Sequence, residues 1–306
     1  MRCLLCIFAT VTVVLSAPNI IVNAAGKYAY SDALARNFFM PACAATEAEN
    51  PASCLSYTYT QLEMKRHVKV VCDETRGIDT CSALTAASHG QKAIVIAFRG
   101  TVGETQLVVE SLTTLLRDRT PWVAGGKVSS YFYNAFFKLW DAGIKDDFTD
   151  LAQANPTYDL YITGHSLGGA LASLGASYIG FNKLFPVEQI KMISLGQPRT
   201  GDSAYANAFD KLIPFAYRII HSRDIVPSIP PKGLEDFRHH KSEIWYSNNM
   251  VDATYKECDA QESLLCSGGQ IDLSTNDHHY YYNAFITFWG LSDCNNATTY
   301  SPYYQP

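Results

Sequence analysis

The stretch "YDLYITGHSLGGALASLGASYIG", Tyr158 to Gly180, combines two structural patterns around one serine. Its first part alternates apolar residues as a strand does, and its second part has the spacing of an amphipathic helix. At the join, Gly164-His165-Ser166-Leu167-Gly168 places a hydroxyl between two glycines. We expect Ser166 at the carboxyl edge of a buried sheet, where open α/β folds bind their ligands.

This arrangement predicts a nucleophile elbow. The flanking glycines suit a tight turn that holds the serine in a strained backbone conformation. A helix that begins at Leu167 directs free N–H groups and a partial positive charge toward any negative charge near Ser166. The alternative is a chance Gly-x-Ser-x-Gly match in a loop. The strand before the motif and the helix after it favour the elbow.

Further strands and helices alternate along the 306 residues. Strand-like runs occur at Val68–Cys72, Ala93–Phe98, Leu160–Thr163, Lys191–Leu195 and Phe215–His221. Helical patterns occur at Tyr131–Asn155, Gly169–Lys183 and Asp202–Leu212. The runs at Ala93–Phe98 and Lys191–Leu195 are almost wholly apolar, as in strands covered on both faces. The sequence therefore predicts one α/β domain with a mostly parallel central sheet flanked by helices.

The first residues have the features of a secretory signal peptide. Arg2 precedes an apolar run from Cys3 to Leu15, and small residues follow it. A membrane anchor is the alternative, but the run is shorter than the ~20 residues that a spanning helix needs. We predict a signal peptide over residues 1–24, cleavage after Ala24, a mature domain over residues 25–306 and a secreted, extracellular protein.

Export affects how the cysteines are interpreted. Seven remain after Ala24: Cys43, Cys54, Cys72, Cys81, Cys258, Cys266 and Cys294. In an oxidising compartment they are expected to form disulfides rather than to bind metal, with one thiol left over. Asn296-Ala297-Thr298 is a glycosylation sequon. The net charge of -5 and the lack of a lysine or arginine run give no sign of a nucleic-acid binder.

A catalytic serine needs a base, and the base needs an orienting acid that precedes it in this kind of fold. The downstream acids include Asp202, Asp210, Asp224, Glu235 and Asp252, and the downstream histidines are His221, His239, His240, His278 and His279. Asp224 is favoured because it follows the strand-like run Phe215–His221 and so leaves the same sheet edge as Ser166. Asp202 is better explained as a helix cap.

The histidine is harder to choose from the residues alone. His239-His240 lies in a charged stretch and is interpreted as a solvated turn. His278-His279 precedes an aromatic segment interpreted as a helix, and composition cannot separate the two neighbours. No carboxylate or third histidine accompanies either pair at ligand spacing, so we expect no metal and no cofactor.

With these residues placed, the chain resembles the class 3 lipases, which are the fungal-type triacylglycerol lipases of the α/β-hydrolase fold. Within this family it resembles the secreted nematode members most. The matching segments are "IAFRGT" (Ile96–Thr101), "ITGHSLGGALASL" (Ile162–Leu174), "GQPRTGD" (Gly196–Asp202), "RDIVPSIPP" (Arg223–Pro231) and "DHHYY" (Asp277–Tyr281). They occur in family order between Leu34 and Cys294.

The resemblance implies a role for individual residues. The family's acid falls on Asp224, and its histidine, which follows an aspartate and precedes an aromatic three positions on, falls on His278, with His279 in reserve. Its oxyanion hole falls on the backbone N–H groups of Leu167 and Thr101, where threonine replaces the usual serine. One departure is Val128–Phe132, which lacks the fungal histidine and glycine and affects the shape expected for the acyl groove.

The resemblance also implies a helical lid over about residues 103–118. There Val108, Leu112, Leu115 and Leu116 lie on one face of a helix; an ordinary surface helix is the alternative. It implies bridges between Cys54 and Cys294, Cys72 and Cys81, and Cys258 and Cys266, with Cys43 unpaired.

The expected function is that of a secreted serine ester hydrolase that cleaves acylglycerols through Ser166, His278 and Asp224. Its expected partner is lipid or ester substrate at a lipid–water interface, with transient contact to a membrane or lipid-droplet surface. An esterase or phospholipase A1 of the same fold is the alternative among enzymes. A secreted lipid-binding protein without turnover is the alternative from another class.

Overall fold

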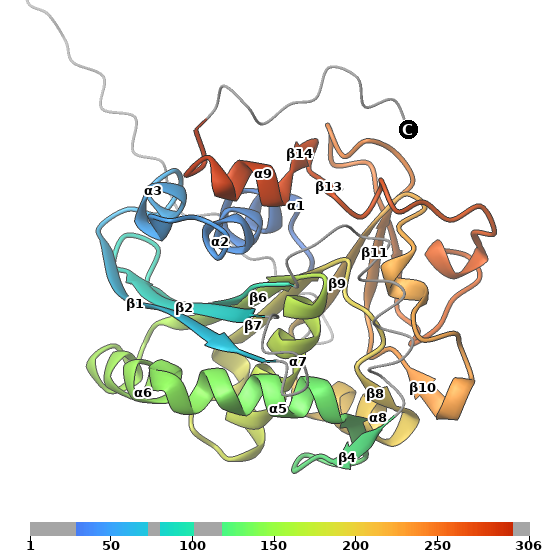
Figure 1. Cartoon of the computed structure of the whole chain (residues 1–306), viewed down its shortest axis with the longest axis horizontal. Coiled ribbons are helices and arrows are strands. Elements are labelled where there is room, and N and C mark those ends of the chain that lie inside the picture. Colours follow the sequence, from blue (N-terminus) through green and yellow to red (C-terminus); the bar gives the residue numbers. More distant parts are fainter. Residues whose placement is uncertain (1–28, 73–79, 101–117, 296–306) are drawn as a thin grey trace, which may run out of the picture.

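The structure is a computed structural model that describes residues 29–72, 80–100 and 118–295 (Figure 1). Four predictions fall outside these residues: the signal peptide, the oxyanion residue Thr101, the lid apart from Asp118, and the sequon at Asn296. None of the described helices is long and apolar enough to cross a membrane.

A twisted sheet forms the centre of the described part of the chain. Its eight strands run in the order β1-β2-β3-β6-β7-β9-β11-β12. Their bounds are β1 Leu62–Val71, β2 Thr80–Ser88, β3 Ala93–Phe98, β6 Asp159–His165, β7 Ile190–Leu195, β9 Ala216–His221, β11 Glu243–Tyr246 and β12 Lys256–Cys258. The strands from β3 to β11 pair in parallel, and β1, β2 and β12 pair antiparallel at the two edges. The predicted mostly parallel sheet is confirmed.

Helices cover both faces of the sheet, as Figure 1 shows. One layer consists of α5 Ser130–Leu139, α6 Lys145–Ala154, α7 Leu167–Phe181 and α8 Ser203–Leu212. The other consists of α1 Asp32–Leu34, α2 Met40–Ala45, α3 Pro51–Leu55 and α9 Ile286–Leu291. Each layer packs on its face through a separate apolar core. Every residue of β3 and β7 is therefore buried, which explains the unbroken apolar sequence of β3 and the mostly apolar sequence of β7.

The helix predicted over Tyr131–Asn155 consists of two helices. A π-helical turn, Trp140–Ile144, joins α5 to α6, and Gly143 within it has a φ of 126°. The aromatic segment after His279 also differs from the predicted helix, because β13 Tyr280–Tyr281 and β14 Ala284–Phe285 form a hairpin before α9 begins. A small second sheet has the order β10-β8-β5-β4, with bounds Phe237–Arg238, Gly201–Asp202, Lys127–Ser129 and Arg119–Pro121.

Three disulfides join parts of the chain. Cys54 is bonded to Cys294, Cys72 to Cys81, and Cys258 to Cys266. Cys43 is a free, buried cysteine. The pairing that the resemblance implied is confirmed. The first bridge closes a loop of 240 residues and ties α3 to the chain that leaves α9.

Candidate active site

Ser166 lies at the sharp turn between β6 and α7. Its φ of 57° and ψ of -129° are unusual for a residue with a side chain, as the elbow pattern predicts. The turn is fixed from both sides, since Ser166 N donates to the Leu195 carbonyl at 2.9 Å and Gly169 N donates to the Ser166 carbonyl at 2.9 Å. The serine is 5% exposed. The fold therefore holds one hydroxyl in a fixed place at the carboxyl edge of the sheet.

The glycines on either side of Ser166 permit a close approach of backbone segments. A Cβ on Gly164 would lie 2.2 Å from the carbonyl atoms of Gly168. A Cβ on Gly168 would lie 2.1 Å from the Phe98 carbonyl oxygen at the end of β3. Any larger residue at either position would push α7 away from the strands, so the spacing of the motif follows from packing.

Asp224 lies in the loop after β9 and is buried. Its carboxylate accepts hydrogen bonds from the Val226 N–H at 2.9 Å, from the Tyr281 hydroxyl at 2.6 Å and from His278 Nδ1 at 2.9 Å. Three donors of this kind stabilise a buried negative charge and hold the carboxylate in one orientation. Among the candidate acids, Asp224 is the one that the structure brings to a candidate histidine.

His278 lies against Asp224 with its side chain 4% exposed. A carboxylate only accepts hydrogen bonds, so Nδ1 carries the proton of the neutral ring and Nε2 is left as an acceptor. This is the tautomer that a general base for a serine requires. His279, the reserve candidate, instead stacks its ring on Phe285, with ring centroids 4.6 Å apart.

His165 connects the serine turn with the histidine. Its ring stacks on that of His278 with centroids 4.5 Å apart, and its Nε2 donates to the His278 carbonyl at 2.8 Å. No hydrogen bond joins the Ser166 hydroxyl to His278 among the described residues. In structures without substrate such bonds are often long, and they tighten when substrate binds.

The loop that carries His278 is fixed to the loop that carries Asp224. The carboxylate of Asp277 accepts from the Arg223 N–H at 3.0 Å and from the Ser274 hydroxyl at 2.8 Å. The Asp277 carbonyl accepts from Nδ1 of the buried His221 at 2.9 Å. Because these residues flank Asp224 and His278, their bonds hold the acid and the histidine together.

A small pocket opens beside the serine turn. Its walls include Gly100, Tyr131, Phe132, Leu167 and Leu171. Leu167 is the first residue of α7, and helix geometry leaves its N–H without an intrahelical acceptor. The second predicted oxyanion residue, Thr101, lies outside the described residues, directly after Gly100. Tyr131 and Phe132 belong to the stretch in which the sequence departs from the fungal pattern, so this departure alters the wall of the pocket.

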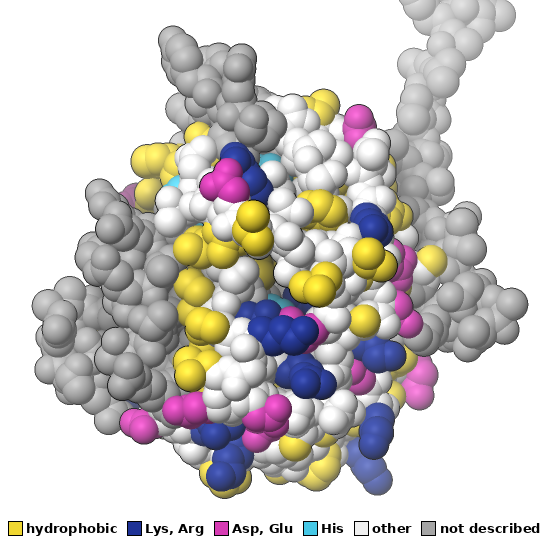
Figure 2. All heavy atoms as spheres, turned by 90° about the vertical axis from the view of Figure 1, so that its right-hand side faces the viewer, with side chains coloured by type: hydrophobic (Ala, Val, Ile, Leu, Met, Phe, Trp, Pro, Cys, Tyr) yellow, Lys and Arg dark blue, Asp and Glu magenta, His cyan; other side chains and the backbone are white. Residues whose placement is uncertain are grey.

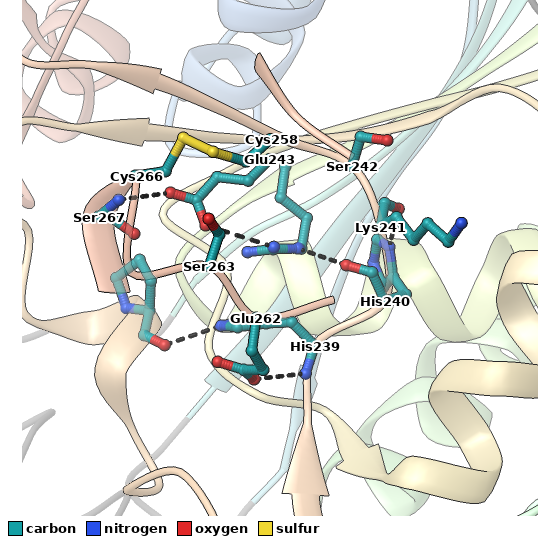
Figure 3. Close-up of polar contacts among 12 residues, drawn as sticks. His239, His240, Lys241, Ser242, Glu243, Cys258, Glu262, Ser263, Cys266 and Ser267 are labelled. Atoms are coloured by element: carbon teal, nitrogen blue, oxygen red, sulfur yellow. Dashed lines mark hydrogen bonds and ion pairs between the residues drawn. A yellow bond between two sulfur atoms is a disulfide. The ribbon is translucent and has the colours of Figure 1, made fainter. Parts of the chain in front are cut away.

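One interpretation from sequence is wrong. His239 and His240 do not form a solvated turn, because they are only 4% and 1% exposed. His239 N donates to Glu262 at 3.1 Å, and Nε2 of the same residue donates to the Pro227 carbonyl (Figure 3). Burial lowers the pKa of His239 well below its usual range, and it lowers that of His240 to about 3. Both rings are therefore neutral parts of the interior.

The other candidate acids make structural contacts elsewhere in the fold. Asp202 caps α8 by accepting from the Tyr205 N–H at 2.9 Å, which confirms its interpretation as a helix cap. Asp210 accepts from Lys241 N at 2.8 Å, and the backbone carbonyl of Asp252 contacts Arg36. Glu235 lies in an exposed turn with its carboxylate 3.5 Å from Arg119. None of these four carboxylates is hydrogen-bonded to a histidine within the described part of the chain.

Two residues near the site were not selected from sequence. Tyr281, which bonds Asp224, was noted only as the aromatic three positions after His278, and that spacing is the signal that could have identified it. His165 stands inside the glycine motif, where its packing against a distant loop has no local signal. The described residues contain no cluster of three or more side chains suited to hold a metal ion.

Comparison with known proteins places this geometry in a family. Residues 95–234 match the model of the family described as lipase (class 3). A lipase of Caenorhabditis elegans is 28% identical over 281 residues, which are 81% of this chain and 78% of that protein. A secreted mono- and diacylglycerol lipase of Fusarium solani is 30% identical over 213 residues, which are 67% of this chain and 61% of that protein.

Among solved structures, lipase II of Rhizopus niveus superposes with a TM-score of 0.74. The match covers 87% of this chain and 98% of that one at 19% identity, and it is therefore evidence for the fold. The central sheet, the flanking helices and this likeness confirm the predicted α/β-hydrolase fold. The family match and the related sequences show that the chain belongs to the class 3 lipases.

Proposed function

We propose that this class 3 lipase is a secreted serine hydrolase that cleaves the carboxylic esters of acylglycerols through Ser166, His278 and Asp224. The single observation that carries the proposal is the hydrogen bond between His278 Nδ1 and the buried Asp224 carboxylate. It sets the tautomer with a free Nε2 acceptor on a loop held against the serine turn. The pattern of a base oriented by an acid is the one that activates a serine hydroxyl.

In the proposed reaction, His278 Nε2 takes the proton of Ser166 as its oxygen attacks the ester carbonyl carbon. The N–H groups of Leu167 and Thr101 bind the oxyanion, and each such donor is worth about 3 kcal/mol in other hydrolases. His278 then gives the proton to the departing alcohol. A water molecule then attacks the acyl-enzyme as His278 takes its proton, and His278 returns that proton to the Ser166 oxygen as the fatty acid is released. Asp224 stabilises the imidazolium form in both steps.

Three lines of support favour acylglycerols and export. The Fusarium solani relative is named as a secreted mono- and diacylglycerol lipase. Disulfides are typical of proteins outside the cytosol, and this chain forms three of them. The N-terminal sequence has the three parts of a signal peptide. The mature protein then begins at Ala25 and acts on lipid in the extracellular medium.

A comparison of rates tests the proposal. The wild type should hydrolyse a dissolved short-chain ester and an emulsified acylglycerol, and Ser166→Ala should lose at least about three orders of magnitude on both. The control is Ser177→Ala, which removes a buried hydroxyl from the same helix, where it bonds the Ser173 carbonyl. Faster hydrolysis of phospholipid than of acylglycerol would favour phospholipase A1. Equal, measurable rates for wild type and Ser166→Ala would refute Ser166 as the nucleophile. A wild type that hydrolyses no ester above the uncatalysed rate would leave a lipid-binding protein.

A further inference from the structure

The segment from Cys258 to Leu273, here called the Cys258 loop, forms an outer layer beside the predicted active site. The disulfide between Cys258 and Cys266 closes its first part, and it has little regular structure beyond the 3-10 turn Ser267–Gly269. In Figure 1 this part of the chain lies at the right-hand margin, beyond β11. It is therefore available to a partner that approaches that side of the molecule.

Charged groups hold the inner side of the Cys258 loop firmly in place. The Glu262 carboxylate accepts from Arg199 Nε at 2.9 Å and from Arg199 Nη2 at 2.8 Å. Ser267 N donates to Glu243 Oε1 at 2.8 Å, and Glu243 in turn lies 3.5 Å from the fully buried Arg218 (Figure 3). With the disulfide, these contacts give the loop a fixed shape before any partner binds.

The outer side of the same loop is strongly apolar. The exposed fractions are 75% for Leu264, 71% for Leu265, 97% for Ile271 and 37% for Leu273. Several apolar patches are visible on the face shown in Figure 2, which is the right-hand side of Figure 1. Exposed apolar side chains that are grouped on one rigid loop indicate a binding surface rather than scattered surface leucines.

This surface is fixed relative to the predicted catalytic residues. Leu273 directly precedes Ser274, whose N–H donates to the Arg223 carbonyl at 2.8 Å. The Ile225 N–H donates to the Ser274 carbonyl at 3.2 Å, so Ser274 pairs with the backbone on both sides of Asp224. Any surface that binds the Cys258 loop is thereby held at a set position relative to Asp224 and His278.

Its chemistry identifies the partner. The Cys258 loop has three charged residues, Asp259, Glu262 and Asp272, and all of them are acidic. Glu262 is neutralised by Arg199, and Asp272 lies 3.1 Å from Arg223. The loop therefore offers no cation of its own to an anionic membrane. Its protruding side chains are also aliphatic, whereas protein interfaces favour Trp, Tyr and Arg anchors in fitted pockets.

We propose that the outer side of the Cys258 loop, through Leu264, Leu265 and Ile271, docks on an uncharged lipid surface such as an acylglycerol droplet. A fluid lipid phase needs no complementary pocket, so it can accept side chains that protrude singly. The preformed loop loses little conformational freedom on binding. The inference rests on the proposed function, because it assigns the surface by which a lipase would reach its aggregated substrate.

Flotation with triacylglycerol emulsion coated with phosphatidylcholine tests this surface, with the full chain in a Ser166→Ala background so that the droplet stays intact. We expect Leu264→Ser/Leu265→Ser to weaken partitioning at least about tenfold, the effect of leaving one large aliphatic side chain unburied. Ile271→Ser should act in the same direction. An approximately tenfold rise in salt should not weaken binding, because no charge pairing is involved.

The matched control is Phe181→Ser/Leu184→Ser. These two residues are each 46% exposed; Phe181 ends α7, which begins at Leu167 directly after Ser166, and Leu184 follows three residues later. The control should bind as Ser166→Ala does. Equal binding by the loop variant, or an equal loss in the control, would overturn the proposal. So would a dimer that the loop variant converts to a monomer, since the surface would then be a contact between copies.

A second measurement separates this proposal from the proposed function. In a chain that keeps Ser166, the Leu264→Ser/Leu265→Ser variant should hydrolyse a dissolved short-chain ester within about twofold of the wild-type rate. Its rate on emulsion should fall about tenfold. Full activity of the loop variant on emulsion would refute the docking surface and leave the hydrolase intact. Loop-dependent flotation by a chain that hydrolyses no ester would refute the hydrolase and leave the docking surface standing.

Discussion

The Tyr281 hydroxyl donates a hydrogen bond of 2.6 Å to the carboxylate of Asp224 on the oxygen that also accepts from His278 Nδ1. Tyr281 is wholly buried, and burial raises its pKa well above its usual range, so the hydroxyl keeps its proton. A tyrosine of the β13–β14 hairpin therefore fixes the acid that is predicted to orient the catalytic histidine. Tyr281 lies three residues after His278, so one short segment positions both side chains that bond to Asp224.

Replacing Tyr281 with Phe should lower kcat on a dissolved ester about tenfold with little change in KM. The ring remains, but the buried carboxylate loses one donor, and a lost hydrogen bond to a charged group costs about 1.5–3 kcal/mol. Tyr205→Phe is the control, because its buried hydroxyl bonds Ser173 at 2.9 Å away from Asp224. Both variants should be destabilised. A kcat that falls equally in the two would mean that Tyr281 acts through stability alone.

His278 and His279 should differ sharply when each is replaced by alanine. His278→Ala removes the ring bonded to Asp224, so kcat should fall by about three orders of magnitude or more. His279→Ala removes a ring stacked on Phe285, and burial and the neighbouring His278 lower its pKa to about 4. We expect its rate to stay within about threefold of the wild type. An inactive His279→Ala beside an active His278→Ala would reverse the assignment.

Local patterns predicted much of the fold. The run Ala93–Phe98 is β3 residue for residue, because a strand buried on both faces needs a continuous apolar sequence. The elbow at Ser166 was also predictable, since one of its glycines, Gly164, is required by a contact with Gly168 inside the motif itself. The break at Gly143 was not, because a glycine is compatible with a helical pattern and the close approach of this one to Arg66 of β1 is a long-range contact.

Long-range contacts explain what the sequence left open. His239 and His240 stand next to charged residues and so suggested solvent, yet Arg199 and Glu262 bury that stretch from other parts of the chain. Composition could not separate His278 from His279, because only the loop geometry brings one of them to Asp224. The catalytic roles of Ser166, Asp224 and His278 remain predictions, as do those of Thr101 and of the lid over residues 103–118.

The free thiol of Cys43 should be invisible to a thiol reagent in the native protein. Cys43 is 1% exposed, and burial raises its pKa to about 12. The reagent therefore cannot reach the thiol, and the thiol is not ionised to the reactive thiolate. In guanidinium without reductant, the secreted protein should show one thiol per chain, since six of its seven cysteines are bridged. Ellman's titration measures both states. Three thiols, with Cys3 and Cys6 added, would show that the signal peptide is retained.

Stability should fall as the pH drops from 6.5 to 5. Burial lowers the pKa values of His165, His221, His239, His240 and His279. A histidine with a lowered folded-state pKa binds its proton more readily when unfolded, so stability is complete above about pH 6.5 and is lost below it. Each such group costs up to about 1.4 kcal/mol per pH unit in this window.

Two carboxylates also affect how stability changes between pH 6.5 and pH 5. Burial raises the pKa of Glu47 to about 7, so its protonation in the folded state opposes part of the loss. Burial opposes ionisation of Glu262, but hydrogen bonds from Arg199 outweigh this effect and lower its pKa. The stability that Glu262 contributes is therefore lost only below the usual pKa range of a carboxylate. Urea unfolding at pH 7 and pH 5 measures the sum. Equal free energies of unfolding would contradict the neutral buried histidines.

Gly196, at the turn after β7, should be essential for the geometry of the predicted triad. Its φ is 60°, and a Cβ at this position would lie 2.8 Å from Asp224 Oδ2, 2.9 Å from the Tyr281 hydroxyl and 3.0 Å from His278 Cε1. A methyl group there cannot be accommodated unless the acid or the histidine moves. We expect Gly196→Ala to lower kcat at least about a hundredfold, as misplacement of catalytic groups by about 1 Å does.

Gly233→Ala is the matched control for Gly196→Ala. Gly233 has a φ of 80°, and a Cβ added to it would meet nothing within 4 Å. Both variants therefore pay a similar backbone cost of about 1 kcal/mol for an alanine in the left-handed region, but only Gly196→Ala contacts the site. Urea unfolding and kcat on a dissolved ester should show comparable losses of stability and a loss of rate in Gly196→Ala alone. A Gly196→Ala enzyme that keeps its rate would mean that Asp224 and His278 are not the acid and base that turnover requires.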